Sequence, residues 1–121
     1  MSQNNDPIYE LIKLQNLSKF DRDDALSYSG ITDAEVKSEA TNTLNQSISK
    51  FIALIQHSDS SNKRFLLTIK NVLESFDRNS LDTEDRERVC LYIEQIMDII
   101  GLESSEGILN KWMYGFDPME T

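Results

Sequence analysis

The most constraining feature of this sequence is a repeat of apolar residues at three- and four-residue spacing in its C-terminal part. The repeat consists of Val89, Ile93, Ile96 and Ile100. This spacing puts the side chains on one face of an α-helix. Acidic residues crowd the predicted first turn, where the helix dipole favours negative charge, and Gly101 suits the left-handed position that ends many helices. Such an apolar face must be covered by other helices, which the rest of the chain is expected to supply.

Helical patterns recur along the whole chain. We expect helices over residues 7–17, 33–57, 63–76, 81–100 and 106–113, with a short helical turn between residues 18 and 30. Thr32 with Glu35 forms a capping box before the second of these helices, and Ser104 or Ser105 caps the last. No period-two run and no Asn-Gly or Asp-Gly turn predicts a strand. Short connections favour antiparallel neighbours, so the sequence predicts an all-α fold, a compact antiparallel bundle of about four main helices plus short helical segments.

The composition indicates one acidic domain. The chain has 121 residues, which suits a single helical domain over residues 1–121 with a frayed N-terminus at residues 1–5. Its formal net charge is −9 and its pI is near 4.5. This charge repels nucleic acids and anionic membranes and attracts basic proteins. The N-terminus lacks the features of a signal peptide and no apolar run is long enough for a membrane span, so we expect a cytoplasmic protein.

The sequence contains no recognisable pattern for catalysis or metal binding. Cys90 is the only cysteine and His57 the only histidine. Cys90 lies in the apolar face of a predicted helix and His57 near a helix C-terminus, so both are expected to be structural. No Glu-x-x-His pair, calcium loop, glycine-rich phosphate loop or HExxH segment occurs. We therefore expect no catalytic residues, no cofactor and no metal, in a protein that is not an enzyme.

Two clusters of carboxylates and a C-terminal group of aromatic residues are the candidates for binding a partner. They are Asp21, Asp23, Asp24, Glu84, Asp85, Glu87, Trp112, Tyr114 and Phe116. Acids at helix starts are commonly only solvated, and large aromatic residues commonly seal a core. The alternative is a binding surface, in which the acids meet a basic partner and the aromatic residues act as anchors. The sequence leaves both interpretations open.

The C-terminal third also resembles a known family. The segments TEDRE at residues 83–87, MDIIGLESSEG at residues 97–107 and LNKWMYGFDP at residues 109–118 are similar to the bacterial family catalogued as domain of unknown function 4844. The resemblance implies a bacterial origin and a stand-alone helical domain. It implies no catalytic residues.

The expected function is protein binding. Small acidic bacterial domains are often immunity proteins, so by analogy we expect a bacterial immunity protein that neutralises a toxic effector through its acidic surface. The expected partner is another protein, a basic toxin or effector domain. The first alternative is an adaptor or a small-ligand-binding regulatory domain. The second is a small enzyme with an unrecognised site.

Overall fold

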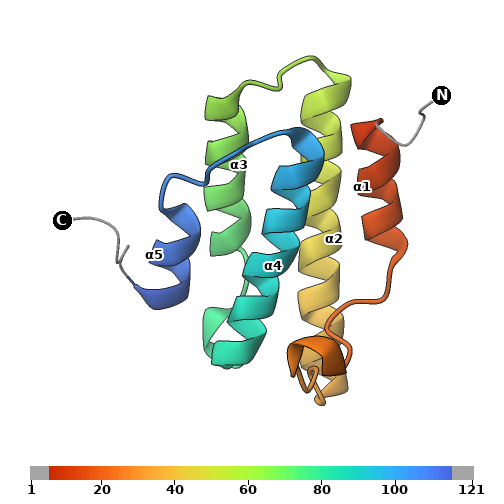
Figure 1. Ribbon diagram of the computed structural model, residues 1–121, viewed down its shortest axis with the longest axis vertical. Helices are drawn as coiled ribbons and strands as arrows, with labels where there is room; N and C mark the ends of the chain where they lie inside the picture. Colours follow the sequence, from red (N-terminus) through yellow and green to blue (C-terminus); the bar gives the residue numbers. More distant parts are fainter. Residues whose placement is uncertain (1–5, 116–121) are drawn as a thin grey trace.

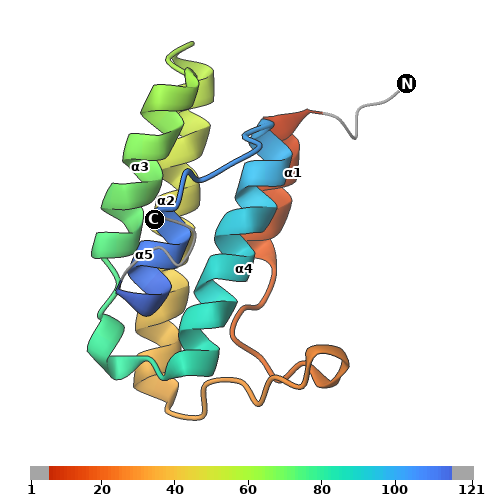
Figure 2. The same cartoon turned by 60° about the vertical axis from the view of Figure 1, so that its left-hand side comes forward.

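The computed structural model describes residues 6–115, which form five α-helices (Figures 1 and 2). The helices are α1 (Pro7–Asn16), α2 (Ala34–Gln56), α3 (Asn62–Glu74), α4 (Thr83–Ile100) and α5 (Ile108–Tyr114). Single turns of 3₁₀-helix lie at Asp24–Leu26 and Arg78–Ser80. Successive helices reverse direction and residues 6–115 contain no β-strand, so the predicted all-α bundle is confirmed. The frayed start predicted for residues 1–5 lies outside the described residues.

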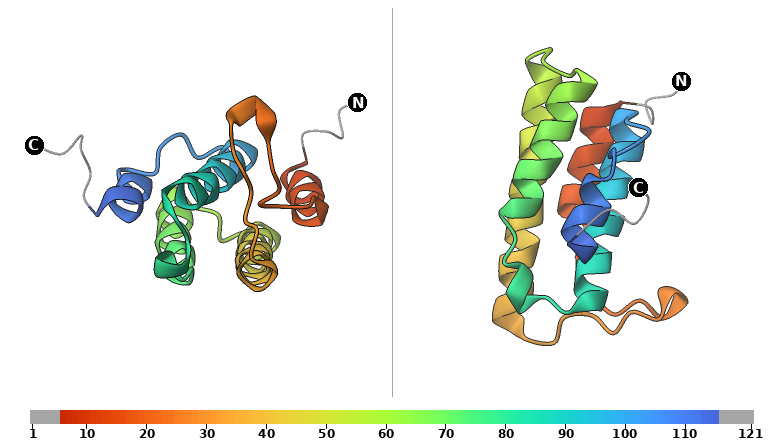
Figure 3. Two further views of the ribbon diagram at one scale, coloured as in Figure 1. Left: turned by 90° about the horizontal axis from the view of Figure 1, so that it is seen from below. Right: turned by 90° about the vertical axis from the view of Figure 1, so that its left-hand side faces the viewer.

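The helices close a ring around one apolar core. α1 packs on α2, α2 on α3, α3 on α5, α5 on α4, and α4 on α1 (Figure 3). All five helices contribute buried side chains to one cluster, with Leu11, Leu44, Ile69 and Ile96 fully buried. Because α4 lies between α1 and α5, the order of the helices around the ring differs from their order in the chain.

The C-terminal end of α4 agrees with the sequence prediction, and its first residue, Thr83, lies two residues after the predicted start. The Asp82 carboxylate accepts a hydrogen bond from an amide of the first turn (2.9 Å). Gly101 has φ 79°, and the amide of Leu102 then donates back to the Met97 carbonyl oxygen (2.9 Å). This closure turns Leu102 into the core, where it is buried.

The start of α2 corrects the prediction of a capping box. The N-cap is Asp33, whose carboxylate accepts hydrogen bonds from Glu35 N (2.9 Å) and Val36 N (3.2 Å). The predicted box of Thr32 with Glu35 is therefore wrong. A carboxylate in this position satisfies two amides that have no partner inside the helix, so the threonine hydroxyl is not needed.

The last helix starts later than predicted. Glu106 has φ 55° and Gly107 has φ 87°, so neither continues a right-handed helix. α5 begins at Ile108, and Gly107 stands at the N-cap position, but the Ser105 hydroxyl still accepts a hydrogen bond from Leu109 N in the first turn (3.5 Å). The Ser104 hydroxyl accepts a hydrogen bond from Glu106 N (3.0 Å) in the turn before the helix.

Arg78 fixes the other end of α5. This half-buried side chain comes from the turn between α3 and α4. Its Nε donates to the Trp112 carbonyl oxygen (2.7 Å) and its Nη2 to the Met113 carbonyl oxygen (3.1 Å). Carbonyls in the last turn have no partner inside the helix, and a cation there complements the helix dipole. A helix of only seven residues is unstable alone, so this side chain holds it against the bundle.

A fully buried lysine closes the end of α1. Lys19 is 1% exposed, and its Nζ donates to the carbonyl oxygens of Gln15 (2.9 Å) and Leu17 (2.7 Å). Burial lowers the pKa of the Lys19 amine, because its partners are neutral carbonyls rather than a carboxylate. The lysine therefore serves as a C-terminal cap for α1.

We expect Arg78→Met to destabilise the attachment of α5. Methionine keeps an apolar stem but removes two charge-assisted hydrogen bonds, so the free energy of unfolding should fall by about 2–3 kcal/mol. Urea denaturation measures this loss, and hydrogen exchange should show the α5 amides losing protection first. Arg64→Met is the control, because the ion pair of Arg64 with Asp59 is exposed and should contribute less than about 1 kcal/mol. Equal losses in the two variants would contradict this role for Arg78.

Candidate functional site

Residues 18–31 form a loop that projects from the bundle beside the start of α4 (Figure 2). Phe20 anchors this loop. Its amide donates to Tyr92 Oη (2.9 Å), and its buried ring meets the Tyr92 ring edge-on, with 5.2 Å between the ring centroids. The amide of Ile31 donates to the Phe20 carbonyl oxygen (3.0 Å), which closes the base of the loop. The loop is therefore fixed to α4 at its base.

Arg88 of α4 makes a second attachment. Its Nη2 lies 3.0 Å from Asp23 Oδ2, and its guanidinium carbon lies 4.9 Å from the Tyr28 ring centroid and 5.5 Å from the Tyr92 ring centroid. The Arg88 side chain is only 14% exposed. A guanidinium is planar and weakly hydrated, so two aromatic rings and one carboxylate are suitable partners for burying it.

Asp85 and Tyr28 make a third attachment. Tyr28 Oη donates to Asp85 Oδ1 (2.8 Å), and both side chains are buried. Burial raises the pKa of Asp85, and burial together with the hydrogen bond to Asp85 raises the pKa of Tyr28. Asp85, one of the predicted partner-binding acids, is thus turned away from solvent and holds the loop.

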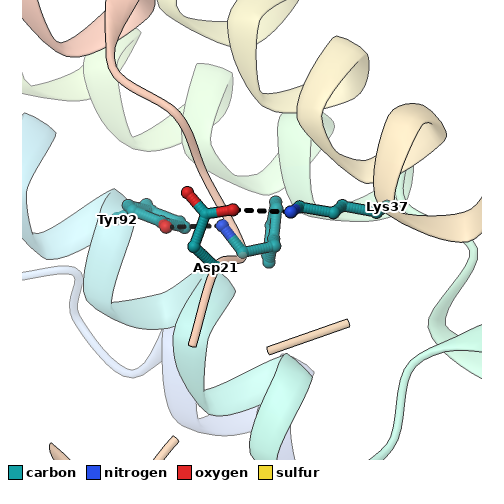
Figure 4. A network of polar contacts seen from close by, with 4 residues as sticks. Asp21, Lys37 and Tyr92 are labelled. Atoms are coloured by element: carbon teal, nitrogen blue, oxygen red, sulfur yellow. Dashed lines mark hydrogen bonds and ion pairs between the residues drawn. The ribbon is translucent and has the colours of Figure 1, made fainter. Parts of the chain in front are cut away.

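The three aspartates of the loop each face a cation of the same chain. Asp21 Oδ1 lies 2.5 Å from Lys37 Nζ (Figure 4), and Asp24 Oδ1 lies 2.6 Å from Arg22 Nε, while Asp23 pairs with α4 as described above. The hydrogen bond from Lys37 holds the pKa of Asp21 below its usual value. These pairs partly neutralise the loop, so its aspartates offer less charge to a partner than the sequence suggests.

Glu84 and Glu87 differ from the loop aspartates. Both are exposed on α4, and neither side chain has an ion pair or hydrogen bond within residues 6–115. They border a surface hollow of about 340 Å³, which we call the loop–α4 hollow. Its lining residues are Leu26, Ser27, Tyr28, Glu84, Glu87, Arg88 and Leu91. Leu26 is 60% exposed, so an apolar side chain stands beside two carboxylates that have no partner in the described part of the chain.

The predicted aromatic residues have different environments. Trp112 is half-buried and meets Phe76 with 6.2 Å between the ring centroids, so it belongs to the core. Tyr114 is 53% exposed at the end of α5. Phe116 lies outside the described residues. Of the predicted aromatic anchors, Tyr114 is thus the one that the structure places at the surface.

Cys90 and His57, the residues best suited to catalysis by type, lie in ordinary helical environments. Cys90 is half-buried on α4, where burial and the charges of Glu94 and Glu87 raise its pKa to about 12. A thiol nucleophile needs the opposite shift. His57 is exposed at the end of α2. Within residues 6–115, no three His, Cys, Asp or Glu side chains are grouped so that they could hold a metal ion, and none of the helices there combines the length and apolar character needed to cross a membrane.

We expect Gly30→Ala to cost more stability than Gly101→Ala. Both glycines have a positive φ, 83° and 79°, which costs an L-residue about 1–2 kcal/mol. A Cβ on Gly30 would also lie 2.7 Å from the backbone nitrogen of Arg22, whereas a Cβ on Gly101 meets no atom within 4 Å. The free energy of unfolding, measured by urea denaturation, should therefore fall by more than about 2 kcal/mol for Gly30→Ala alone. Equal losses of unfolding free energy in the two variants would show that the backbone at the base of the loop shifts to accommodate the added Cβ at no energetic cost.

We expect Asp85→Asn to change the pH dependence of stability. The folded-state pKa of Asp85 is raised, so the wild-type chain loses stability as the pH rises from the unfolded pKa, near about 4, to the folded pKa. Asparagine still offers Tyr28 an acceptor but does not ionise. The stability of the variant relative to wild type should therefore increase with pH across this window, as urea denaturation at a series of pH values would measure. Tyr28→Phe keeps the buried carboxylate but removes its hydrogen-bond donor, so the stability of this variant relative to wild type should decrease with pH. Stability curves that run parallel to wild type in both variants would contradict the raised pKa of Asp85.

Comparisons with known proteins identify the family of this chain. A crystal structure of a DUF3571 family protein from Acinetobacter baumannii AYE matches it with a TM-score of 0.85 and 36% sequence identity, covering 93% of this chain and 94% of that chain. No curated protein matches the chain. The model of the family described as "Domain of unknown function (DUF4844)" matches residues 2–117, which extends the resemblance of the C-terminal segments to nearly the whole sequence. The chain therefore belongs to the DUF4844 family.

Proposed function

We propose that this chain is a protein-binding module that recognises a basic partner at the loop–α4 hollow. The observation that carries the proposal is the pair Glu84 and Glu87, which are exposed and have no partner within residues 6–115. Carboxylates without a partner in the chain are available to pair with the cations of another molecule. The exposed Leu26 beside them offers apolar surface, and burying this surface against a partner would be favourable. The net charge of −9 adds a long-range attraction for basic proteins.

The attachments of the loop support this proposal. Association costs less when the binding surface is ordered before the partner arrives. Arg88 and Asp85 hold the loop through side chains, and Phe20 holds it through its backbone amide. On this proposal, the buried polar residues keep the hollow in shape, while the exposed glutamates meet the partner.

In its finer form, the proposed function is that of an immunity protein. The acidic surface would occupy the basic active-site cleft of a toxic effector and exclude the substrate. This form is supported by the charge and size of the domain and by analogy with other small acidic domains. An adaptor would use the same surface without inhibiting its partner, so the activity of the bound partner distinguishes the two roles.

Small-ligand binding has less support. The surface hollows described for residues 6–115 have volumes of about 260 Å³ to about 370 Å³. Ligand pockets commonly occupy about 300–1,000 Å³ and enclose most of the ligand. These hollows lie near the lower end of that range and are similar to one another, so none stands out as a dedicated ligand site.

We expect the double variant Glu84→Gln/Glu87→Gln to lose affinity for the natural partner. Tagged wild-type chain would first capture the partner from a lysate of the source organism, and surface plasmon resonance would then measure association at low and high salt. The loss should be about tenfold or more, mainly in the association rate, and should shrink at high salt.

The control is Glu35→Gln/Glu39→Gln, which removes the same charge from exposed positions of α2. This control should bind almost as well as wild type. Unchanged binding by the Glu84→Gln/Glu87→Gln variant would refute the hollow as the binding site. An equal loss in both double variants would mean that binding depends on net charge alone, which would also overturn the proposal.

A further inference from the structure

We infer that the partner contacts this chain through a basic α-helix that lies lengthwise along the exposed face of α4. The inference rests on the proposed function and adds the shape and chemistry of the element that binds. It follows from a row of residues on α4, from the hollows on both sides of that row, and from the spacing of its charges.

The row runs along nearly the whole of α4. It consists of Glu84, Glu87, Leu91, Glu94 and Asp98, and we call it the acidic stripe. Steps of three and four residues keep these side chains on one face, opposite the buried residues of α4. The four acids are exposed, and Leu91 lies half-buried among them. At about 1.5 Å per residue the stripe is about 21 Å long, which extends it well beyond the loop–α4 hollow.

The stripe lies between two walls. The 18–31 loop stands on one side of α4 and α5 on the other (Figures 1 and 3). The loop–α4 hollow occupies the first side, and a second hollow of about 260 Å³, bordered by Leu109, Met113 and Tyr114 of α5, occupies the other. Glu87 and Leu91 border both hollows. Helices pack by placing rows of side chains into the grooves beside a row on their neighbour, and this face of α4 has that form.

The charges of the stripe identify the chemistry of its occupant. The stripe contains no basic residue, and Arg88 beside it already pairs with Asp23. A second copy of this chain would place acids against acids, and nucleic acid or an anionic membrane would be repelled as well. Lysine or arginine side chains are the matching partners, with an apolar residue facing Leu91.

The spacing of the stripe favours a helix over an extended segment. Successive stripe residues are about 5 Å apart along the axis of α4, because they alternate between three and four helical steps. Residues on one face of an extended chain recur about every 6.6 Å. Over the four intervals of the stripe, an extended segment would fall about 5–6 Å out of register with the acids. A helix with its basic residues at three- and four-residue spacing stays in register throughout.

The test uses two synthetic peptides of identical composition and charge. The striped peptide is an alanine- and glutamine-rich helix of about 18 residues with lysines at the spacing of the four acids and leucine at the place of Leu91. The isomer holds the same residues with its lysines spread around all faces of the helix. Circular dichroism confirms that both are equally helical, and fluorescence anisotropy measures their binding to the full chain at low salt.

We expect the striped peptide to bind about tenfold more tightly than the isomer and to shift the NMR signals of residues 84–98. Glu94→Gln/Asp98→Asn, which changes the end of the stripe away from the loop, should weaken its binding by about the same factor as Glu84→Gln/Glu87→Gln. Glu35→Gln/Glu39→Gln on α2 should leave it nearly unchanged.

The inference of a helical partner would be overturned if the two peptides bound equally well or if neither bound. It would also be overturned if the Glu94→Gln/Asp98→Asn variant bound the striped peptide as tightly as wild type. The proposed function would survive each of these results if Glu84→Gln/Glu87→Gln still lost the natural partner, because the hollow would then bind a basic segment that is not helical. The proposed function fails separately, when that double variant keeps the natural partner at full affinity.

Discussion

One buried guanidinium determines how the least regular part of this fold is held. Arg88 lies between the rings of Tyr28 and Tyr92 and pairs with Asp23, so a single α4 side chain contacts the loop at two points. Without a cation at this place, the Asp23 carboxylate and the aromatic rings would have no common partner, and the attachment of the loop to α4 would depend on the Phe20 amide and the hydrogen bond of Tyr28 to Asp85. The position of the loop in turn creates the hollow beside α4. The shape of the candidate site therefore depends on an interaction that is itself largely hidden from solvent.

The structure also separates acids that look alike in the sequence. Asp85 and Glu84 are adjacent residues in one acidic helix start, yet Asp85 is buried against Tyr28 and Glu84 is exposed. The difference follows from helix geometry, since neighbouring residues point about 100° apart around the axis. A count of negative charge thus overstates the surface that is available to a partner. Of the two acidic clusters, the exposed glutamates of α4, rather than the aspartates of the loop, carry charge without an ion-pair partner within residues 6–115.

Local rules were sufficient to predict the helices but not the site. The apolar period of α4 and its closure at Gly101 depend on neighbours a few residues away, so both could be read from the sequence. The attachment of Arg88 joins residues 65 positions apart, and nothing in the sequence distinguishes this arginine from other polar residues of α4. The late start of α5 was missed for a different reason: Glu106 adopts a left-handed conformation that is uncommon for glutamate, so the helix begins two residues after it.

The closed ring of helices has a consequence for folding during synthesis. α1 is covered on one side by α4, and the bond between Phe20 and Tyr92 joins residues 72 positions apart. Contacts at such separation form late, because a long segment of chain must be ordered before they are made. The ribosome adds residues in sequence, so the first three helices keep an apolar side exposed until α4 has been synthesised. Exposed apolar surface favours aggregation, so the order of synthesis, and not only the stability of the finished bundle, bears on how safely this chain folds.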